Sequence, residues 1–277
     1  MELFLILLIL VSVIAGIIGS LFGIGGGIVI IPVLILLFHV SVKEAIGASI
    51  ISVIVTSSAA ASVYIKSDIV NFKLGMLLEI FTVLGAITGA LLLGVFNPKI
   101  LLIIFSVVLT ISSFLIFLKK NNNNKYYQED HISKYFDLDS KYYDESDNKV
   151  IEYHPAHISY GFISMYIAGL ISGLLGIGSG VFKVTSFDSI MKIPMKVSTT
   201  TSNFMIGVTA CASAFIYLVR GYINPYISIP VAVGIFLGAM IGTKILYKQH
   251  DTTLKNIFFV ILIAIALEMF FRALGIL

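Results

Sequence analysis

The sequence predicts an all-α membrane protein made of two inverted repeats, each with about four transmembrane helices and a short, glycine-broken re-entrant half-helix. Three observations lead to this prediction. Hydrophobic residues make up 58% of the chain and charged residues only 12%, whereas a soluble domain carries roughly 25% charged residues. Long apolar runs recur along the chain, and the second half repeats the first, including a glycine cluster inside an apolar run.

The apolar runs are regularly spaced in both halves. They fall at about 3–22, 28–38, 44–65, 74–96 and 99–118, and again at about 158–175, 181–191, 198–219, 225–246 and 256–276. Most of them approach or exceed the ~20 residues that a spanning helix needs. The runs 28–38 and 181–191 would rise only about 17 Å, so we expect them to be half-helices that return from a turn near mid-membrane. The first run has no Lys or Arg before it and has a repeat partner inside the chain, which favours a membrane segment over a signal peptide.

The duplication rests on residues that recur at a constant offset of 153 positions, since Gly16 pairs with Gly169 and 169 − 16 = 153. Without a gap, the same offset pairs Gly23 with Gly176, Gly25 with Gly178, Gly27 with Gly180, Lys43 with Lys196, Ser49 with Ser202, Tyr64 with Tyr217, Asn71 with Asn224, Gly85 with Gly238 and Gly89 with Gly242. Matches at one constant offset over so many residues are not expected by chance, so the chain is an internal duplication.

Basic residues favour an inverted arrangement of the halves. If each glycine break is a hairpin, each half crosses the membrane an odd number of times. One side then holds 13 basic residues and the other holds 4, with Lys183 left uncounted inside a short run. The rival arrangement, in which each broken run crosses once, gives 10 against 7. Because basic residues concentrate on the cytoplasmic side, the first arrangement predicts that both termini lie outside.

The long polar stretch separates the two halves. We expect a first membrane repeat at 1–118, a polar cytoplasmic linker at 119–157 and a second membrane repeat at 158–277. The linker carries four consecutive asparagines, several tyrosines and mixed charge, and it matches no part of the first half. It is therefore predicted to be a disordered connector, with a partner-binding role as the alternative.

The glycine clusters are the first candidate for a substrate site. Irregular backbone at membrane depth survives only where protein buries it or where it lines a wet cavity. A half-helix that starts at Gly27 or Gly180 presents free N–H groups and a partial positive charge, which together attract an anion. Close helix packing through glycine is the alternative. The residues expected to bind substrate here are Gly25, Gly26, Gly27, Gly178, Ser179 and Gly180.

Hydroxyl-rich stretches open the third segment of each half. Ser49 recurs as Ser202, which Asn203 follows. Hydroxyl and amide groups donate hydrogen bonds that suit a polyoxyanion, although Ser and Thr also bond between helices in membranes. We expect Ser49, Ser202 and Asn203 to bind substrate because they are nearest the repeat-paired core.

Ionisable residues inside apolar runs are a further signal. Lys183 lies three residues past Gly180, and an ionisable group at that depth is a functional hypothesis by default; the alternative is a side chain that snorkels to the interface. Its repeat position is Ile30, so any role is asymmetric. Asp188 can be its partner or a coupling carboxylate. Glu79 can relay a proton, but a buried, protonated carboxyl that faces a neighbouring helix is the simpler interpretation.

Catalysis has little support in the sequence. No His and Glu fall at metal-ligand spacing, and no Ser, His and Asp set lies within the apolar runs. We therefore expect no enzyme activity, no metal and no cofactor. The net charge of +3 is small and gives no reason to expect nucleic acid as a partner.

The motifs resemble the sulfite exporter TauE/SafE family of membrane permeases. The resemblance rests on G-S-L-F-G-I-G-G-G-I-V-I-I-P from Gly19 and A-S-I-I-S-V from Ala48, and in the second half on G-L-L-G-I-G-S-G from Gly173 and T-S-N-F-M-I-G-V-T-A from Thr201. It implies a transporter of small sulfur-containing anions, such as sulfite or organosulfonates. Ser179 replaces the middle glycine of the second cluster, and Thr185 stands where the first half has Pro32.

Together these observations predict a secondary transporter in the cell membrane, an exporter by resemblance, that moves small anions by alternating access. Its partners would be a small inorganic or organic anion and the lipid bilayer. Two alternatives stay open: an anion channel, and a non-transporting membrane scaffold that binds a cytoplasmic partner through residues 119–155.

Overall fold

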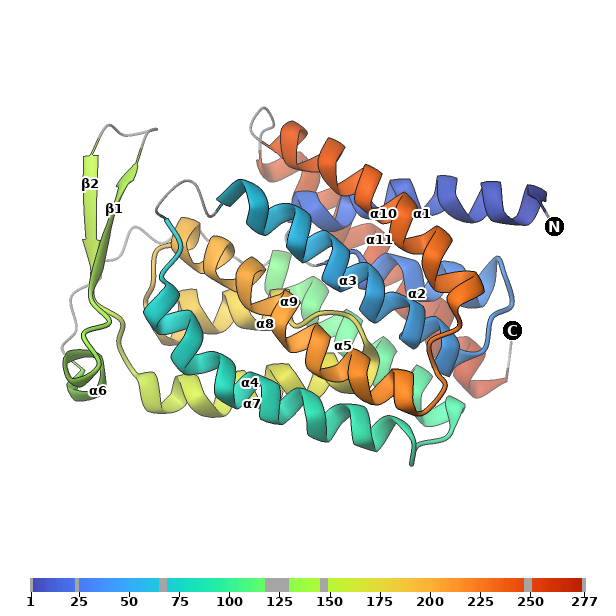
Figure 1. The fold of residues 1–277 in the computed structure, drawn as a ribbon, viewed down its shortest axis with the longest axis horizontal. Coiled ribbons are helices and arrows are strands. Elements are labelled where there is room, and N and C mark those ends of the chain that lie inside the picture. Colours follow the sequence, from blue (N-terminus) through green and yellow to red (C-terminus); the bar gives the residue numbers. More distant parts are fainter. Residues whose placement is uncertain are drawn as a thin grey trace.

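The computed structural model describes residues 2–22, 25–64, 69–117, 130–144, 149–246 and 251–275. Nearly all of these residues lie in helices, apart from one small hairpin between the halves (Figure 1). The elements are α1 (Glu2–Phe22), α2 (Gly27–Leu36), α3 (Val42–Tyr64), α4 (Phe72–Leu93), α5 (Pro98–Phe117), α6 (His131–Tyr135), β1 (Ser140–Asp144), β2 (Lys149–Tyr153), α7 (Ile158–Leu175), α8 (Gly180–Thr185), the π-helix η2 (Ser186–Ile190), α9 (Met195–Val219), α10 (Pro225–Leu246) and α11 (Asp251–Leu274).

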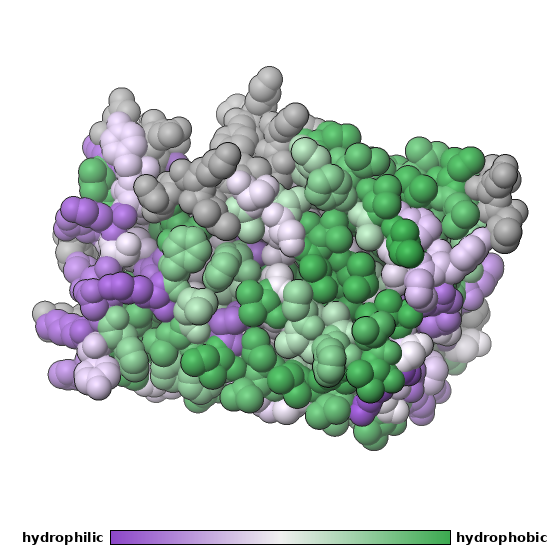
Figure 2. Space-filling model, viewed as in Figure 1, coloured by the Kyte–Doolittle hydropathy of each residue, from purple (hydrophilic) through white to green (hydrophobic). Residues whose placement is uncertain are grey.

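Within the described part of the chain, 6 helices are long and apolar enough to cross a membrane. They are α3, α4, α5, α7, α9 and α10. Figure 2 shows that hydrophobic side chains cover the middle of the molecule and that hydrophilic side chains gather toward its two ends. Large apolar residues such as Ile80, Ile163 and Phe215 are exposed to the surroundings of the protein. Such exposure suits a lipid environment and confirms a multi-pass membrane protein.

Both glycine breaks predicted from the sequence are present. In the first half α1 ends at Phe22 and α2 begins at Gly27. Gly25 and Gly26 have φ angles of 84° and 68°, a left-handed backbone that glycine adopts without strain. In the second half, Gly176 and Gly178 have φ angles of 65° and 64°. Gly23 and Ile24 lie outside the described residues.

The short helix after each break differs between the halves. In the first half α2 is regular over 10 residues, although Pro32 lies inside it. In the second half α8 has 6 residues and continues as the π-helix η2 over 5 more. Thr185 stands at the repeat position of Pro32 (185 − 153 = 32), and its hydroxyl donates a 2.8 Å hydrogen bond to the Val181 carbonyl oxygen.

Close glycine contacts join the two halves. A Cβ on Gly16 in α1 would lie 2.5 Å from the carbonyl oxygen of Ile235 in α10. A Cβ on Gly169 in α7 would overlap the carbonyl oxygen of Thr82 in α4. The second contact follows from the first by the repeat offset, because 16 + 153 = 169 and 235 − 153 = 82. The packing of α1 on α10 is thus repeated by that of α7 on α4, and glycine is required at both crossings.

The ends of the molecule differ in character. Figure 1 shows the start of α1 and the end of α11 at one end, whereas α6, β1 and β2 lie at the opposite end. β1 and β2 pair in antiparallel register, with Ser140 opposite Tyr153 and Asp144 opposite Lys149. The described part of the linker, 130–144 and 149–157, therefore lies at the end opposite the termini.

This ordered structure corrects the expectation of a disordered connector for residues 130–144 and 149–157. Tyr153 is 1% exposed and packs with Leu138 and Ile158 in a second apolar core. The amide of Asn71, at the start of α4, donates hydrogen bonds of 3.1 Å to the Leu138 carbonyl oxygen and to the Tyr153 hydroxyl. Burial of aromatic side chains supplies the stabilisation that composition alone did not suggest. The asparagine run at 121–124 lies outside the described residues.

Asp130 fixes the linker to α7. Its Oδ1 accepts hydrogen bonds from the backbone N–H groups of Ile132 and Ser133, and its Oδ2 accepts one from Ile158 N–H at 3.0 Å. Partial burial acts to raise the pKa of Asp130, but these hydrogen bonds outweigh it and hold the pKa below its usual value. One carboxylate therefore caps both α6 and α7.

Candidate functional site

The two glycine breaks meet inside the protein. A Cβ on Gly27 would lie 2.8 Å from the carbonyl oxygen of Gly176 and 2.6 Å from the hydroxyl oxygen of Ser49. Gly27 is the first residue of α2, and Gly176 is the left-handed residue that ends α7. The backbones of the two breaks therefore touch at a point where no larger residue than glycine fits.

Ser49 joins this contact from α3. Its side chain is fully buried, and its hydroxyl donates a 2.7 Å hydrogen bond to the Gly176 carbonyl oxygen. The hydroxyls of Ser52 and Thr56 bond instead within their own helix, to the carbonyl oxygens of Ser49 and Ser52. Of the predicted binding residues, Gly27 and Ser49 thus lie against the second glycine break. Ser49 has a structural role there, because its hydrogen bond holds the Gly176 carbonyl group.

Gly25 and Gly26 line the same break. The nearest neighbour of Gly25 is the side chain of Val53 in α3, at 3.2 Å from a Cβ built on the glycine. For Gly26 the nearest atoms are in Ile235 at 3.2 Å and the Thr56 hydroxyl at 3.4 Å. Both glycines are buried, so a side chain at either position would need a strained backbone and would displace packed neighbours.

Ser179 and Ser202 carry buried hydroxyls without a hydrogen-bond partner. Both side chains are fully buried, and neither oxygen has a partner among the described residues. Ser179 is the residue before α8, between the buried residues Gly178 and Gly180. Ser202 is the repeat partner of Ser49 but lacks its bond to a glycine carbonyl. Buried hydroxyls are normally satisfied, but four more buried serines, Ser12, Ser112, Ser172 and Ser228, also lack a partner among the described residues.

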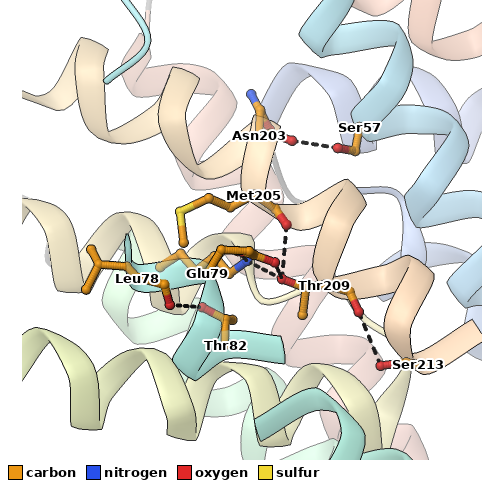
Figure 3. A network of polar contacts seen from close by, with 9 residues as sticks. Ser57, Leu78, Glu79, Thr82, Asn203, Met205, Thr209 and Ser213 are labelled. Carbon is orange, nitrogen blue, oxygen red and sulfur yellow. Dashed lines mark hydrogen bonds and ion pairs between the residues drawn. The ribbon is translucent and has the colours of Figure 1, made fainter. Parts of the chain in front are cut away.

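Lys183 is held in a buried polar cluster with residues from two other helices. Its side chain is fully buried, and its Nζ lies 3.4 Å from Oε2 of Glu79 in α4 and 2.6 Å from the hydroxyl oxygen of Thr209 in α9. The Thr209 hydroxyl also lies 2.5 Å from Oε1 of Glu79 and 3.0 Å from the Met205 carbonyl oxygen (Figure 3). We call Glu79, Lys183 and Thr209 the charged cluster.

The geometry of the charged cluster shows whether the Lys183 side chain is buried or extends to the membrane interface. The side chain does not snorkel, because it is buried together with a carboxylate that is only 5% exposed. Its ion-pair partner is Glu79, which corrects the idea that Asp188 takes this part. Glu79 does face a neighbouring helix, as the simpler interpretation held, but it meets a cation there.

Asn203 lies above the charged cluster on α9 in Figure 3. Asn203 is 4% exposed. Its backbone carbonyl oxygen accepts a 2.5 Å hydrogen bond from the Ser57 hydroxyl of α3. This bond ties α3 to α9, the second long helix of each half. The hydrogen bond from Ser57 therefore restrains the backbone position from which the Asn203 side chain extends.

Sequence reasoning missed two parts of this arrangement. Thr209 was only one of several hydroxyl residues, and Glu79 was separated from Lys183 by 104 positions. The available signal was the rarity of charges within apolar runs, since such groups usually pair with one another. Among the residues that the structure describes, no group of three His, Cys, Asp or Glu side chains could hold a metal ion.

Comparison with known proteins gives a consistent result. The family model for the sulfite exporter TauE/SafE matches residues 8–269. The probable membrane transporter protein YunE of Bacillus subtilis is 26% identical over 276 residues, which cover 97% of this chain and 98% of that protein. The probable membrane transporter protein MJ0441 of Methanocaldococcus jannaschii is 29% identical over 264 residues, or 90% of this chain and 89% of that protein. No solved structure matches significantly.

Proposed function

Because the chain belongs to the sulfite exporter TauE/SafE family, a family of membrane transporters, we propose that it exports small anions of the sulfite or organosulfonate type by alternating access. The observation that carries this proposal is the contact between the two glycine breaks, where Gly27 lies against the Gly176 carbonyl oxygen beside Ser49. Transporters built from repeats bind their substrates where discontinuous helices meet.

Helix starts supply the attraction for an anion. The first N–H groups of a helix have no partner within it and carry a partial positive charge. At the start of α2 the N–H of Gly27 bonds to the Gly25 carbonyl oxygen at 2.8 Å, and those of Val29 and Ile30 bond to the Gly26 carbonyl oxygen at 3.1 Å, so an anion would have to replace bonds within the turn. Before α8, Gly178, Ser179 and Gly180 place no large side chain over the first N–H groups. A sulfite or sulfonate group has three oxygen atoms, so several donors that converge on it suit its shape.

Side chains complete the proposed site. The unpartnered hydroxyls of Ser179 and Ser202 supply donors, and the amide of Asn203 supplies another from α9. Ser49 holds the second break in place, and Lys183 supplies a full positive charge one turn into α8. The binding residues that we propose are Gly25, Gly26, Gly27, Ser49, Gly178, Ser179, Gly180, Lys183, Ser202 and Asn203.

The two membrane repeats, 1–118 and 158–277, are proposed to be inverted relative to each other. Support comes from the glycine contacts that recur at the repeat offset and from the position of the termini opposite the hairpin (Figure 1). With the basic residues as guide, the linker 119–157 is cytoplasmic and both termini are outside the cell. Rocking of one repeat against the other would then open the site to each side in turn.

Efflux of labelled sulfite from proteoliposomes tests the proposal. The wild-type protein should carry out saturable efflux, whereas Gly26→Leu and Lys183→Ala should reduce the rate at least tenfold. Gly221→Asn is the matched control, because Gly221 also has a positive φ of 72° but has no atom within 4 Å of its Cβ position, and Asn tolerates this backbone. Wild-type rates from both site variants would contradict the site, and a conductance beyond carrier turnover in planar bilayers would indicate a channel instead.

A further inference from the structure

The charged cluster occurs at only one of two equivalent places in the duplicated scaffold. The repeat offset converts Lys183 into Ile30 (183 − 153), Glu79 into Ala232 (79 + 153) and Thr209 into Thr56 (209 − 153). The first-half place therefore contains Ile30, which is fully buried, and a threonine whose hydroxyl bonds to the Ser52 carbonyl oxygen. Ile30 and Ala232 replace the charged pair at that place, so packing alone does not require charges at the other.

Stability does not explain the cluster either. Desolvation of a buried ion pair usually offsets its attraction, and apolar residues of similar volume often do as well or better. Other cross-helix polar links avoid charge altogether, for example the bond from the Tyr217 hydroxyl to the Gly173 carbonyl oxygen. A buried lysine and glutamate within membrane-spanning helices therefore indicate a function.

We propose that Glu79 takes up a proton when an anion binds at Lys183, so that anion and proton cross the membrane together. This inference rests on the proposed anion site. Before binding, the Glu79 carboxylate neutralises the Lys183 ammonium group. When the anion takes the place of the carboxylate beside Lys183, Glu79 would remain as an unpaired buried charge, which is costly. For a singly charged anion, a proton from solvent added to Glu79 leaves the cluster neutral both before and after the exchange.

Thr209 can form a hydrogen bond with Glu79 whether the Glu79 carboxyl group is ionised or protonated. Its single hydroxyl proton has two acceptors within reach, Oε1 of Glu79 at 2.5 Å and the Met205 carbonyl oxygen at 3.0 Å. With Glu79 ionised, the hydroxyl donates to the carboxylate. With Glu79 protonated, the hydroxyl accepts from the new O–H group and donates to Met205 instead. Thr209 is thus a positioning residue that keeps the neutral acid hydrogen-bonded.

Lys183 is the charged group that contacts Glu79 from the helices packed around it, within the part of the chain that is described. Tyr160 is largely exposed, the Tyr166 hydroxyl is paired with Thr88, and Cys211 is exposed. The other titratable groups on the elements around α4 are Asp188, which is partly exposed in η2, Lys196 and Arg220 near the two ends of α9, and Tyr217, which is bonded to Gly173. Protonation of Glu79 is therefore coupled chiefly to the position of Lys183.

Proton uptake by the purified full-length protein in detergent tests the inference. Methanesulfonate is a suitable probe because it carries a single negative charge and does not titrate near neutral pH. The wild-type protein should take up about one proton per bound anion, measured with an indicator dye in unbuffered solution. Its apparent Kd should rise about tenfold per pH unit where Glu79 is ionised. Thr209→Ser should keep this behaviour, and Thr209→Val should change its pH midpoint.

Glu79→Gln should bind the anion with no proton uptake and with a pH-independent Kd, because Gln resembles the neutral acid. Glu268→Gln, at an exposed position on α11, should behave like the wild type. Anion binding by the wild type without proton uptake would overturn the coupling and leave the proposed function standing, even if Glu79→Gln failed to fold. No binding of methanesulfonate, sulfate or sulfite would overturn the proposed function and this inference together.

Discussion

The hydroxyl of Ser49 donates a 2.7 Å hydrogen bond to the carbonyl oxygen of Gly176, which lies 127 residues away in the other half of the chain. The bond crosses from α3 to the turn that follows α7. It satisfies the carbonyl oxygen of Gly176, whose N–H group donates a 2.8 Å hydrogen bond to the Ser172 carbonyl oxygen. A break in one half is thus positioned by a helix of the other half.

Removal of this bond should weaken the fold. We expect Ser49→Ala to lower the free energy of unfolding by about 1–3 kcal/mol, because it leaves a buried carbonyl oxygen unsatisfied. Thermal unfolding of the detergent-solubilised protein measures the change. Ser58→Ala is the control, since that exposed hydroxyl bonds to the Ile54 carbonyl oxygen of its own helix. Equal midpoints for the two variants would show that the bond does not hold the turn.

Gly27 should tolerate no side chain. A methyl group there would meet the Ser49 hydroxyl at 2.6 Å and the Gly176 carbonyl oxygen at 2.8 Å, and a backbone atom cannot move as cheaply as a flexible side chain. Gly27→Ala should therefore separate the two breaks and reduce sulfite efflux at least tenfold. Gly221→Asn serves again as the control, because its surroundings are open. Wild-type efflux from Gly27→Ala would mean that the close contact is dispensable.

Ser202 should affect affinity without supporting the fold. Its buried hydroxyl has no partner among the described residues, so Ser202→Ala should leave the unfolding midpoint unchanged or raise it. A lost hydrogen bond to an anion should weaken binding by about 1.5–3 kcal/mol, or roughly 10- to 100-fold in Kd. Anion titration and thermal unfolding of the same sample separate the two effects. A destabilised variant with unchanged Kd would assign Ser202 to packing.

The sequence was sufficient to predict where the helices break but not which side chains meet. The breaks were predictable because glycine inside an apolar run is costly at membrane depth, and the half-helices begin at Gly27 and Gly180 as expected. The pairing of Lys183 with Glu79 was not predictable, because it depends on how α4, α8 and α9 rotate against each other. A repeat offset relates equivalent positions, and Lys183 has no charged equivalent.

The hairpin was missed for a different reason. Its strands, Ser140–Asp144 and Lys149–Tyr153, are 5 residues each, too short for a clear alternation of polar and apolar residues. Their stability comes from long-range contacts, such as the bond between Asn71 and Tyr153. The polar composition of the linker therefore gave no indication of a packed structure. Its tyrosines were the sequence feature that could have indicated one.

Asp130 should make the stability of this linker dependent on pH. Hydrogen bonds keep its pKa below the usual value, so its contribution is complete above the pKa of the unfolded chain. The contribution is lost as the pH falls through the lowered pKa of the folded state. Asp130→Ala should cost about 1 kcal/mol at neutral pH through loss of the cap, and the difference from wild type should vanish in acid.

Asp137→Asn is the control for Asp130, because Asp137 has a positive φ of 49° that Asn tolerates. The carboxylate of Asp137 pairs with Lys73 at 2.5 Å, but the two side chains are 80% and 64% exposed, and exposed pairs contribute little. Thermal unfolding across pH, together with tryptic cleavage after Lys141, should separate the two variants. Faster cleavage in Asp137→Asn than in Asp130→Ala would contradict the assignment of Asp130 as the anchor of the linker.

The central claim is that backbone N–H groups at the two glycine breaks bind the anion, and amide hydrogen exchange with and without sulfite tests it most directly. Peptides that contain residues 25–30 and 178–183 should both exchange more slowly when sulfite is present, while a peptide within α5 should not change. Slower exchange elsewhere, with no change at either break, would contradict the claim.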